Sequence, residues 1–456
     1  MKRAAFIIIC LFLPVAASVK PKYDGFITLE MSFVNSSITE IMDCPHRMLE
    51  NIYEPLVTAD KDSPSVRGQL STCQYLAGYN GISILLNDSA KFSNGDFLSS
   101  YDIINGWLKI IIKNPYKYNA LLGNVKGYEE ILQEKSNTIS GFKIIDNRTI
   151  AVEFIKPDSQ FHIRLALQGL PAVKSVRQNS YFIGTGPFKV NNFTPDRLGL
   201  ERNPFYRFAP AFPRAADILL KREKNRFLSF QTMKYDGISI FLNSDYDYIK
   251  QYVKKPFKLA PVSRLFFFLK LNPALDMESR KYLASCIDKN AIFHALIQAK
   301  GLISGGLVSD IQTGTVVPDV HGTLQRPVKI IIRNGDKYLK TCADGIFAQL
   351  LKSGIKSDIT EYECKDFYKK SNDGDYDIIL ENFKIGNDID KGALRLFYTY
   401  FSPVLLSMDI KELSRYEDLL KTNVLYLPLF EIHESMLCHD YVRNISASLD
   451  NIWKLE

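Results

Sequence analysis

Apolar residues recur along the chain in two patterns, one typical of strands and one typical of helices. The strand patterns cover residues 25–31, 82–86, 141–154, 198–202, 216–221, 264–271, 328–333, 376–380 and 425–430. The helix patterns cover residues 47–56, 99–113, 280–299, 337–353 and 409–422. Because the two kinds of segment alternate from end to end, the sequence predicts a mixed α/β fold with more than one sheet.

One stretch, KFSNGDFLSSYDIINGW at residues 91–107, contains signals for a turn and a helix start. It follows the strand pattern of residues 82–86, and its Asn94-Gly95 pair adopts positive φ at little cost. Ser99 stands three residues before Asp102, the spacing of a capping box. We therefore expect a strand, a turn at Gly95 and a helix capped by Ser99.

Two further motifs have simple structural interpretations. Phe266, Phe267 and Phe268 lie in an apolar run with too few polar positions to alternate, which predicts a buried strand. The run GTGPF at residues 184–188 predicts a tight loop entering a strand, with its glycines at unusual φ values. No Lys-Ser or Lys-Thr follows in the place that a phosphate-binding loop requires.

The composition is that of a globular protein of more than one domain. The chain has 456 residues, of which 46% are hydrophobic and 23% charged, and this length suggests two or three domains. The net charge of +7 is spread along the chain, and basic clusters are interrupted by acidic or apolar residues. This distribution is typical of a solvated surface, so we expect no nucleic-acid partner.

The amino terminus reads as a secretory signal peptide over residues 1–18. Lys2 and Arg3 precede an apolar run that ends in the small residues Ala16, Ala17 and Ser18. Cys10 lacks the small preceding residue of a lipidated cysteine, which argues against a lipid anchor. No later segment approaches the roughly 20 apolar residues of a transmembrane helix. We therefore expect a periplasmic protein whose mature chain begins near Val19.

The cysteines beyond the signal peptide are even in number. An oxidising compartment favours disulfides, and six cysteines allow 15 connectivities that the sequence does not distinguish. The pairs nearest in sequence, Cys44 with Cys73 and Cys342 with Cys364, are the first that we expect.

Motifs for catalysis and metal binding are absent from the sequence. No CxxC or HExxH spacing occurs, and the only close histidines, His433 and His439, are six residues apart and are accompanied by no CxxC pair. There is also no GxSxG elbow, Walker A loop or dinucleotide fingerprint. We expect no catalytic residue, no metal ligand and no cofactor.

Taken in order, several short phrases resemble the peptide and nickel family of bacterial extracellular solute-binding proteins, family 5, the receptors of ABC importers. Single phrases carry little information, but their order across most of the chain is specific. The phrases are NIYEPLV at 51–57, KFSNG at 91–95 with SSYD at 99–102, IGTGPF at 183–188, RNPFY at 202–206, FFFLKLN at 266–272, IDK at 287–289, YDIIL at 376–380 and YLPL at 426–429.

The resemblance implies a two-lobed α/β periplasmic binding protein fold of type II, in its large peptide-binding class, with an extra subdomain in the first lobe. By this reading the first lobe covers residues 19–260, with the subdomain at about 50–160. The second lobe covers residues 261–424, and residues 425–456 return to the first lobe. The family implies a monomeric receptor that captures a peptide or small molecule and passes it to an ABC permease and its ATPase.

The resemblance also suggests which residues contact the ligand. Peptide-binding relatives carry a Trp shortly after the late strand, and then an Asp that pairs with the peptide's amino terminus. In this chain Phe383 stands near the first position and Gly386 near the second, with Asn387, Asp388 and Asp390 beside it. By position in the family pattern we expect ligand contacts from six residues, which are His46, Arg47, Phe383, Asn387, Asp388 and Asp390.

Other functions remain open at this point. The ligand could instead be a nickel chelate or another small solute. The segment between residues 301 and 329 is shorter than in most relatives. Together with the missing Asp, it leaves open a receptor scaffold that has been repurposed for sensing or as a chaperone. Adjacent importer permease genes would argue against that alternative, and turnover of a substrate would instead indicate an enzyme.

Overall fold

The architecture is built on three sheets, of which the largest has 11 strands. The computed structural model describes residues 25–31, 51–59, 66–168, 170–174, 183–194, 196–208, 210–211, 213–220, 222–253, 256–307, 326–386, 397, 401 and 410–443. Within these residues the chain also forms a 4-stranded sheet and a 2-stranded sheet. The strands and helices alternate along the chain, which confirms the predicted mixed α/β class.

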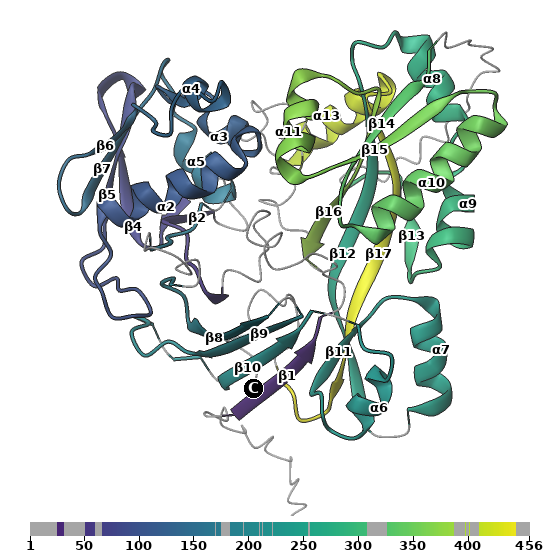
Figure 1. Ribbon diagram of the computed structural model, residues 1–456, viewed down its shortest axis with the longest axis horizontal. Coiled ribbons are helices and arrows are strands. Elements are labelled where there is room, and N and C mark those ends of the chain that lie inside the picture. Colours follow the sequence, from purple (N-terminus) through teal and green to yellow (C-terminus); the bar gives the residue numbers. More distant parts are fainter. Residues whose placement is uncertain are drawn as a thin grey trace, which may run out of the picture.

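The large sheet runs through two regions of the molecule (Figure 1). Its strand order is β15-β14-β16-β12-β17-β11-β1-β10-β9-β8, and β13 pairs with β17 off this path. We call the region of β1, β8–β11, α6 and α7 the base, and the region of β13–β16, α8–α11, η5 and α13 the upper lobe. The strands of the base are β1 (Gly25–Glu30), β8 (Phe188–Thr194), β9 (Arg197–Arg202), β10 (Pro213–Leu219) and β11 (Gly237–Ile240), and its helices are α6 (Arg226–Gln231) and α7 (Asn243–Tyr252).

Two long antiparallel strands, β12 (Phe257–Leu271) and β17 (Tyr426–His439), connect the base with the upper lobe. Where β12 enters the upper lobe, Phe266, Phe267 and Phe268 are all buried, because apolar layers cover both faces of the sheet there. The predicted buried strand is therefore confirmed, and it is longer than the apolar run indicated.

The upper lobe places helices on both faces of its strands. Ile330 and Ile332 of β14 pack in one core with α10, whereas Ile331 packs on the opposite face with Phe367 of α11. Alternate residues of a strand point to opposite faces, so this strand separates α10 from α11. The strands are β13 (Gly301–Ile303), β14 (Val328–Arg333), β15 (Ser357–Tyr362) and β16 (Ile378–Gly386). The helices are α8 (Met277–Ser285), α9 (Lys289–Ala291), the π-helical η5 (Ile292–Ile297), α10 (Lys337–Lys352), α11 (Cys364–Asp373) and α13 (Ile410–Thr422).

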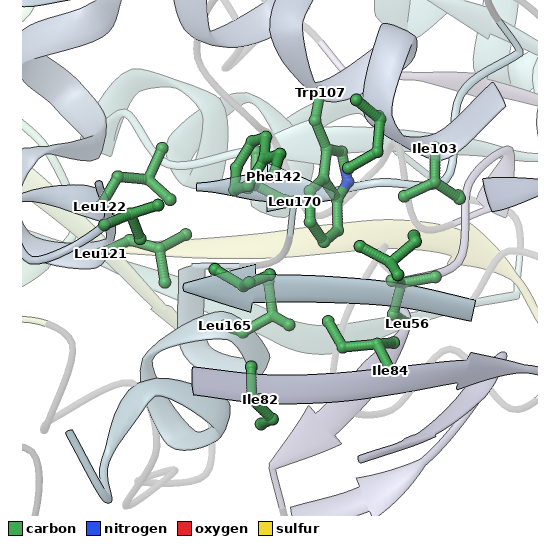
Figure 2. Packing of buried hydrophobic residues seen from close by; sticks show 14 of the residues in the cluster. Leu56, Ile82, Ile84, Ile103, Trp107, Leu121, Leu122, Phe142, Leu165 and Leu170 are labelled. Atoms are coloured by element: carbon green, nitrogen blue, oxygen red, sulfur yellow. The ribbon is translucent and has the colours of Figure 1, made fainter. Parts of the chain in front are cut away.

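A third region, which we call the subdomain, has its own sheet and core. Figure 2 shows that core, in which Trp107 packs near Phe142 and Ile103 above Ile84 of the sheet. The strands are β2 (Val57–Ala59), β3 (Val66–Gly68), β4 (Ser71–Tyr75), β5 (Gly81–Leu86), β6 (Phe142–Ile144) and β7 (Thr149–Glu153). The helices are η2 (Ala77–Tyr79), α2 (Ser100–Lys113), η3 (Pro115–Tyr118), α3 (Asn119–Leu122), α4 (Tyr128–Leu132) and α5 (Phe161–Gln168).

The turn and helix start expected after β5 are both present. Gly95 has a φ of 92°, and its N–H donates to the carbonyl of Phe92 at 2.9 Å. The Ser99 hydroxyl accepts from the backbone N–H of Asp102 at 3.2 Å, and α2 begins at Ser100, directly after Ser99. The structure therefore contains one half of the predicted capping box, which is the bond from the Asp102 N–H to the Ser99 hydroxyl. The Asp102 carboxylate also accepts a hydrogen bond from the Ser99 hydroxyl.

Two predicted helices are wrong. Residues 51–56, the described part of the helix expected over residues 47–56, form no α-helix. The Leu56 carbonyl accepts backbone N–H groups from residues 69–71, and Pro55 pairs with Pro171 as an isolated β-bridge. The continuous helix expected over residues 280–299 is instead interrupted. Asp288 caps a new start there by accepting from the N–H of Ala291, and the following turns are π-helical.

The glycines of the GTGPF loop are required for a different reason from the one predicted. The loop does enter β8, but Gly184 and Gly186 do not have positive φ. A Cβ at Gly184 would lie 2.1 Å from the Ile52 carbonyl oxygen, and one at Gly186 would lie 2.7 Å from the Ile52 carbonyl carbon. Close approach of two backbone segments therefore excludes larger residues.

The disulfides expected between neighbouring cysteines are wrong. Cys73 and Cys342 are free thiols, and Cys286 and Cys438 are free as well. Cys342 lies on α10, while Cys364 begins α11 on the other face of the sheet, so the strands separate them. Cys44 lies outside the described residues. Among the described helices, none is long and apolar enough to cross a membrane.

Candidate ligand-binding site

The structure describes one of the six residues expected to contact a ligand. Phe383 lies on β16, on the side of the upper lobe that faces the subdomain in Figure 1. The strand ends at Gly386, directly before Asn387, Asp388 and Asp390, which lie outside the described residues together with His46 and Arg47. The end of β16 therefore marks where this acidic segment begins.

Phe383 belongs to a group of aromatic rings on one face of the large sheet. It stands opposite Phe266 of β12, and its ring centroid lies 5.4 Å from that of Phe397. Much of the Phe383 side chain packs within the protein, so a ligand could contact only the part that remains accessible. We call this group the aromatic cluster, and its members are Phe266, Phe268, Phe383, Phe397, Phe401 and Tyr426.

Lys270 of β12 borders the aromatic cluster. Its Nζ lies 5.8 Å from the ring centroid of Tyr376 and 5.9 Å from that of Phe401, within the range of cation–π attraction. Burial lowers the pKa of Lys270, and the negative charge of Glu381 acts in the opposite direction. The sequence analysis missed this residue, although a lysine inside a run of aromatic and aliphatic residues is an unusual feature.

Two buried carboxylates on this face are already paired with arginines. Arg333 Nε lies 2.8 Å from Glu381 Oε1, and Arg264 NH1 lies 3.1 Å from Glu431 Oε2. His433 Nε2 lies 3.6 Å from the same oxygen of Glu431. Strand alternation places Arg264 on the same face as Phe266, and Glu381 lies opposite Phe268 on the neighbouring strand. Each of these two carboxylates beside the aromatic cluster is therefore compensated by a guanidinium.

This pairing bears on which carboxylate could bind a ligand's ammonium group. A ligand cation near Glu381 or Glu431 would compete with a guanidinium that already compensates the buried charge. These two glutamates are therefore weaker candidates than their position near Phe383 suggests. The paired residues are far apart in sequence, so no local pattern predicts the pairing.

A third buried carboxylate, Glu434, lies where β12, β16 and β17 meet the base. The Ser263 hydroxyl donates to Glu434 Oε2 at 2.6 Å, and Lys384 Nζ lies 3.2 Å from the same oxygen. Ser263 is also paired with Gly386 in the strand ladder. These bonds fix the end of β16 against the two long strands.

Metal binding was not expected from the sequence. Within the described part of the chain, no three or more His, Cys, Asp or Glu side chains are grouped so that they could hold a metal ion.

The large fold is shared with solved solute-binding proteins. AgaA from A. tumefaciens in complex with agropinic acid has a TM-score of 0.66 at 16% identity, covering 95% of this chain and 98% of that chain. NikA from Brucella suis with Fe(III)-EDTA has a TM-score of 0.64 at 17% identity, covering 95% and 100%. OppA from Haemophilus influenzae with the peptide RPPGFSPFR has a TM-score of 0.62 at 16% identity, covering 95% and 98%.

These similarities show the fold, which is the two-lobed type II arrangement that the sequence predicted. No curated protein sequence matches the chain significantly. The model of bacterial extracellular solute-binding proteins, family 5 Middle, matches residues 81–402, which is more than half of the chain. The chain therefore belongs to family 5 of the bacterial extracellular solute-binding proteins, as its ordered phrases suggested.

Proposed function

We propose that this family 5 receptor captures peptides between its subdomain and upper lobe and delivers them to an ABC permease and its ATPase. It acts as a binding protein without catalytic turnover, in the periplasm and as a monomer. Among proteins of the same fold, OppA from Haemophilus influenzae was solved with a nine-residue peptide, and MppA from Escherichia coli is a murein tripeptide binding protein. NikA and AgaA were solved with other small molecules, so the fold alone does not select peptides.

The observation that carries this proposal is the end of β16. An accessible part of Phe383 lies three residues before Gly386, and Asn387, Asp388 and Asp390 follow. An aromatic wall beside a carboxylate suits the first side chain and the ammonium group of a peptide. Because Glu381 and Glu431 already pair with arginines, we assign the ammonium anchor to Asp388 or Asp390.

The long strands also suggest the limits of the lobes. β12 passes from the base into the upper lobe and contains residue 261. Residue 425 directly precedes β17, which begins in the upper lobe and passes back to the base. We propose the first lobe at residues 19–260, the second at 261–424 and the return at 425–456. The signal peptide at residues 1–18 and the contacts of His46 and Arg47 are part of the same proposal.

The first test identifies the ligand class by thermal stabilisation. A ligand that binds only the folded state stabilises it by about 2.7 kcal/mol at a hundred times its dissociation constant. We expect stabilisation by members of a panel of di- to pentapeptides, and not by nickel chelates or sugars. Stabilisation by a chelate alone would replace the peptide assignment, and catalytic consumption of any panel member would exclude the receptor function.

The second test locates the anchor with trialanine and its N-acetylated form, or with whichever stabilising peptide the panel gives. Asp388→Asn or Asp390→Asn should weaken binding by about 2 to 5 kcal/mol at the anchor position, because the buried ammonium would lose its partner. Acetylation should have a similar effect on the unmodified protein. Asp358→Asn, at an exposed position on the edge strand β15, is the matched control and should leave affinity unchanged. Equal affinity for free and acetylated peptides would contradict the proposal.

A further inference from the structure

The upper lobe touches the subdomain directly through α11, which packs against η3. These elements belong to regions that are far apart in sequence, and their contact does not involve the strands that connect the base with the upper lobe. Two sets of polar side-chain contacts join them. One set is centred on Asn372 of α11, and the other is the ion pair of Lys365 with Glu134.

Asn372 bonds to both sides of this contact. Its Oδ1 accepts from Asn119 Nδ2 at 3.1 Å, and its Nδ2 donates to the carbonyl of Tyr116 at 3.3 Å. The same Nδ2 donates to the carbonyl of Tyr368 within α11 at 2.8 Å. An amide nitrogen has two hydrogens, so both donors of Asn372 are used, one within its helix and one across the contact.

The ion pair involves the opposite end of α11 from Asn372, because Lys365 is the second residue of this helix. Lys365 Nζ is 2.9 Å from Glu134 Oε1, and the two side chains are 43% and 71% exposed. Its hydrogen bond and charge lower the pKa of Glu134. Glu134 also has a φ of 56°, a left-handed conformation that is uncommon for residues other than Gly, Asn and Asp. The turn after α4 is therefore held in a strained backbone conformation at the residue that reaches α11.

We propose that these contacts form a latch that sets the equilibrium between the closed and open arrangements of the subdomain and the upper lobe. The latch consists of Asn119, Glu134 and the Tyr116 carbonyl on one side, and of Lys365 and Asn372 on the other. Since the two sides belong to different lobes, they must separate when the lobes open. The inference rests on the proposed receptor function, because it assumes that the lobes open and close around a ligand.

The chemistry of the latch suits reversible opening. Exposed ion pairs and neutral hydrogen bonds are weak in water, because water replaces them when they break. Each contact should change the ratio of closed to open protein by about two- to fivefold. Ligand affinity scales with the fraction of binding-competent protein, so the latch tunes affinity through residues that do not touch the ligand.

Small-angle X-ray scattering of the mature chain, stripped of ligand by unfolding and refolding, tests the latch without knowledge of the ligand. Asn372→Ala, Lys365→Glu and Glu134→Lys should each increase the radius of gyration. The double variant Lys365→Glu with Glu134→Lys restores opposite charges and should return it to the value of the unmodified protein. Melting curves check that each variant is folded, and the charge swap keeps the test informative if Asn372→Ala is poorly folded.

Lys340→Glu is the matched control. It breaks the pair of Lys340 with Glu361, in which Nζ lies 2.7 Å from Oε1 and the side chains are 45% and 35% exposed. Both residues lie within the upper lobe, so this variant should leave the radius of gyration unchanged. An equal change in the control, or no change in the three single variants, would overturn the latch. A double variant that stays as open as the single charge variants would overturn the role of the ion pair.

Failure of the latch can be told apart from failure of the peptide proposal. With trialanine, or a stabilising peptide from the panel, as the probe, the latch variants should bind about two- to fivefold more weakly. Asp388→Asn or Asp390→Asn, whichever removes the anchor, should weaken binding much more than the latch variants do, and should leave the scattering of the ligand-free protein unchanged. If no peptide binds, the scattering measurements on the ligand-free protein still show whether the latch contacts hold the lobes closed.

Discussion

Two contacts between the upper lobe and the rest of the described molecule have opposite physical character. Beside η5, the segment after β11 enters the core of the upper lobe: Phe241 is 1% exposed, and Leu242 pairs with Ala299 as an isolated β-bridge. Backbone bonds join the two sides there, with the Lys300 N–H 2.6 Å from the Phe241 carbonyl oxygen. We call this contact the seam. The latch instead consists of exposed polar side chains.

This difference indicates which contact yields when the lobes move. Opening the seam would expose Phe241 and its neighbours to water and break backbone bonds in a buried setting, and both changes are costly. Opening the latch exchanges protein–protein for protein–water hydrogen bonds at little net cost. The seam should therefore remain closed and define the rotation axis, whereas the latch separates.

The largest effect should come from Phe241→Ala at the seam. Removing this ring leaves a cavity beside Tyr338, whose ring centroid lies 5.5 Å away, and should lower the free energy of unfolding by about 3 to 5 kcal/mol. Urea unfolding followed by circular dichroism measures it. Asn372→Ala, the matched change at the latch, should lower it by less than about 1 kcal/mol. Equal losses at the two sites would remove the distinction between seam and latch.

Salt should produce a smaller effect that is confined to the latch. Raising the salt concentration from 0.1 M to 1 M shortens the Debye length from about 10 Å to about 3 Å, which weakens exposed ion pairs. The radius of gyration of the unmodified protein should therefore rise slightly. Lys365→Met lacks the pair and should show no such rise. A rise of the same size in this variant would assign the salt effect to other charges.

Acid should also weaken the latch through Glu134. The pKa of Glu134 is lowered by Lys365, so the ionised carboxylate favours the closed arrangement at pH values above its ordinary pKa of about 4.3. This contribution is lost as the pH falls through the lowered pKa of the closed form. Between pH 6 and pH 3 the unmodified protein should open more than Glu134→Gln, as measured by scattering. Other carboxylates titrate in both proteins, so identical pH profiles would contradict a role for Glu134.

Several features followed from sequence alone because their causes are local. The Gly95 turn needs a residue that tolerates positive φ, and the Ser99 cap needs a hydroxyl at the first turn of a helix. The phenylalanines at 266–268 were correctly predicted to be buried, since a run without polar positions cannot face water. The ordered family phrases gave the fold in the same way, as short segments whose meaning does not depend on distant contacts.

Errors occurred where distant residues decide the outcome. Residues 51–56 favour a helix by pattern, but they form no α-helix, and the Leu56 carbonyl instead accepts backbone N–H groups from residues 69–71. Cys342 and Cys364 are near in sequence, but β14 and its neighbours separate their helices. At the candidate site the sequence predicts a ligand contact from Phe383, whereas only the fold shows the packing of Phe383 against Phe397 and the pairing of Glu381 with Arg333.

The α/β class, the family and the place where an acidic segment follows an aromatic strand can be read from the order of residues alone. Which carboxylates are already paired with arginines, and the bond of Asn119 to Asn372, 253 positions away, become known only from the folded chain. The physical reason is that turns, caps and strand periodicity depend on backbone preferences within a few residues. A bond between distant side chains depends instead on how whole sheets and helices pack, and no short segment of the sequence contains that information.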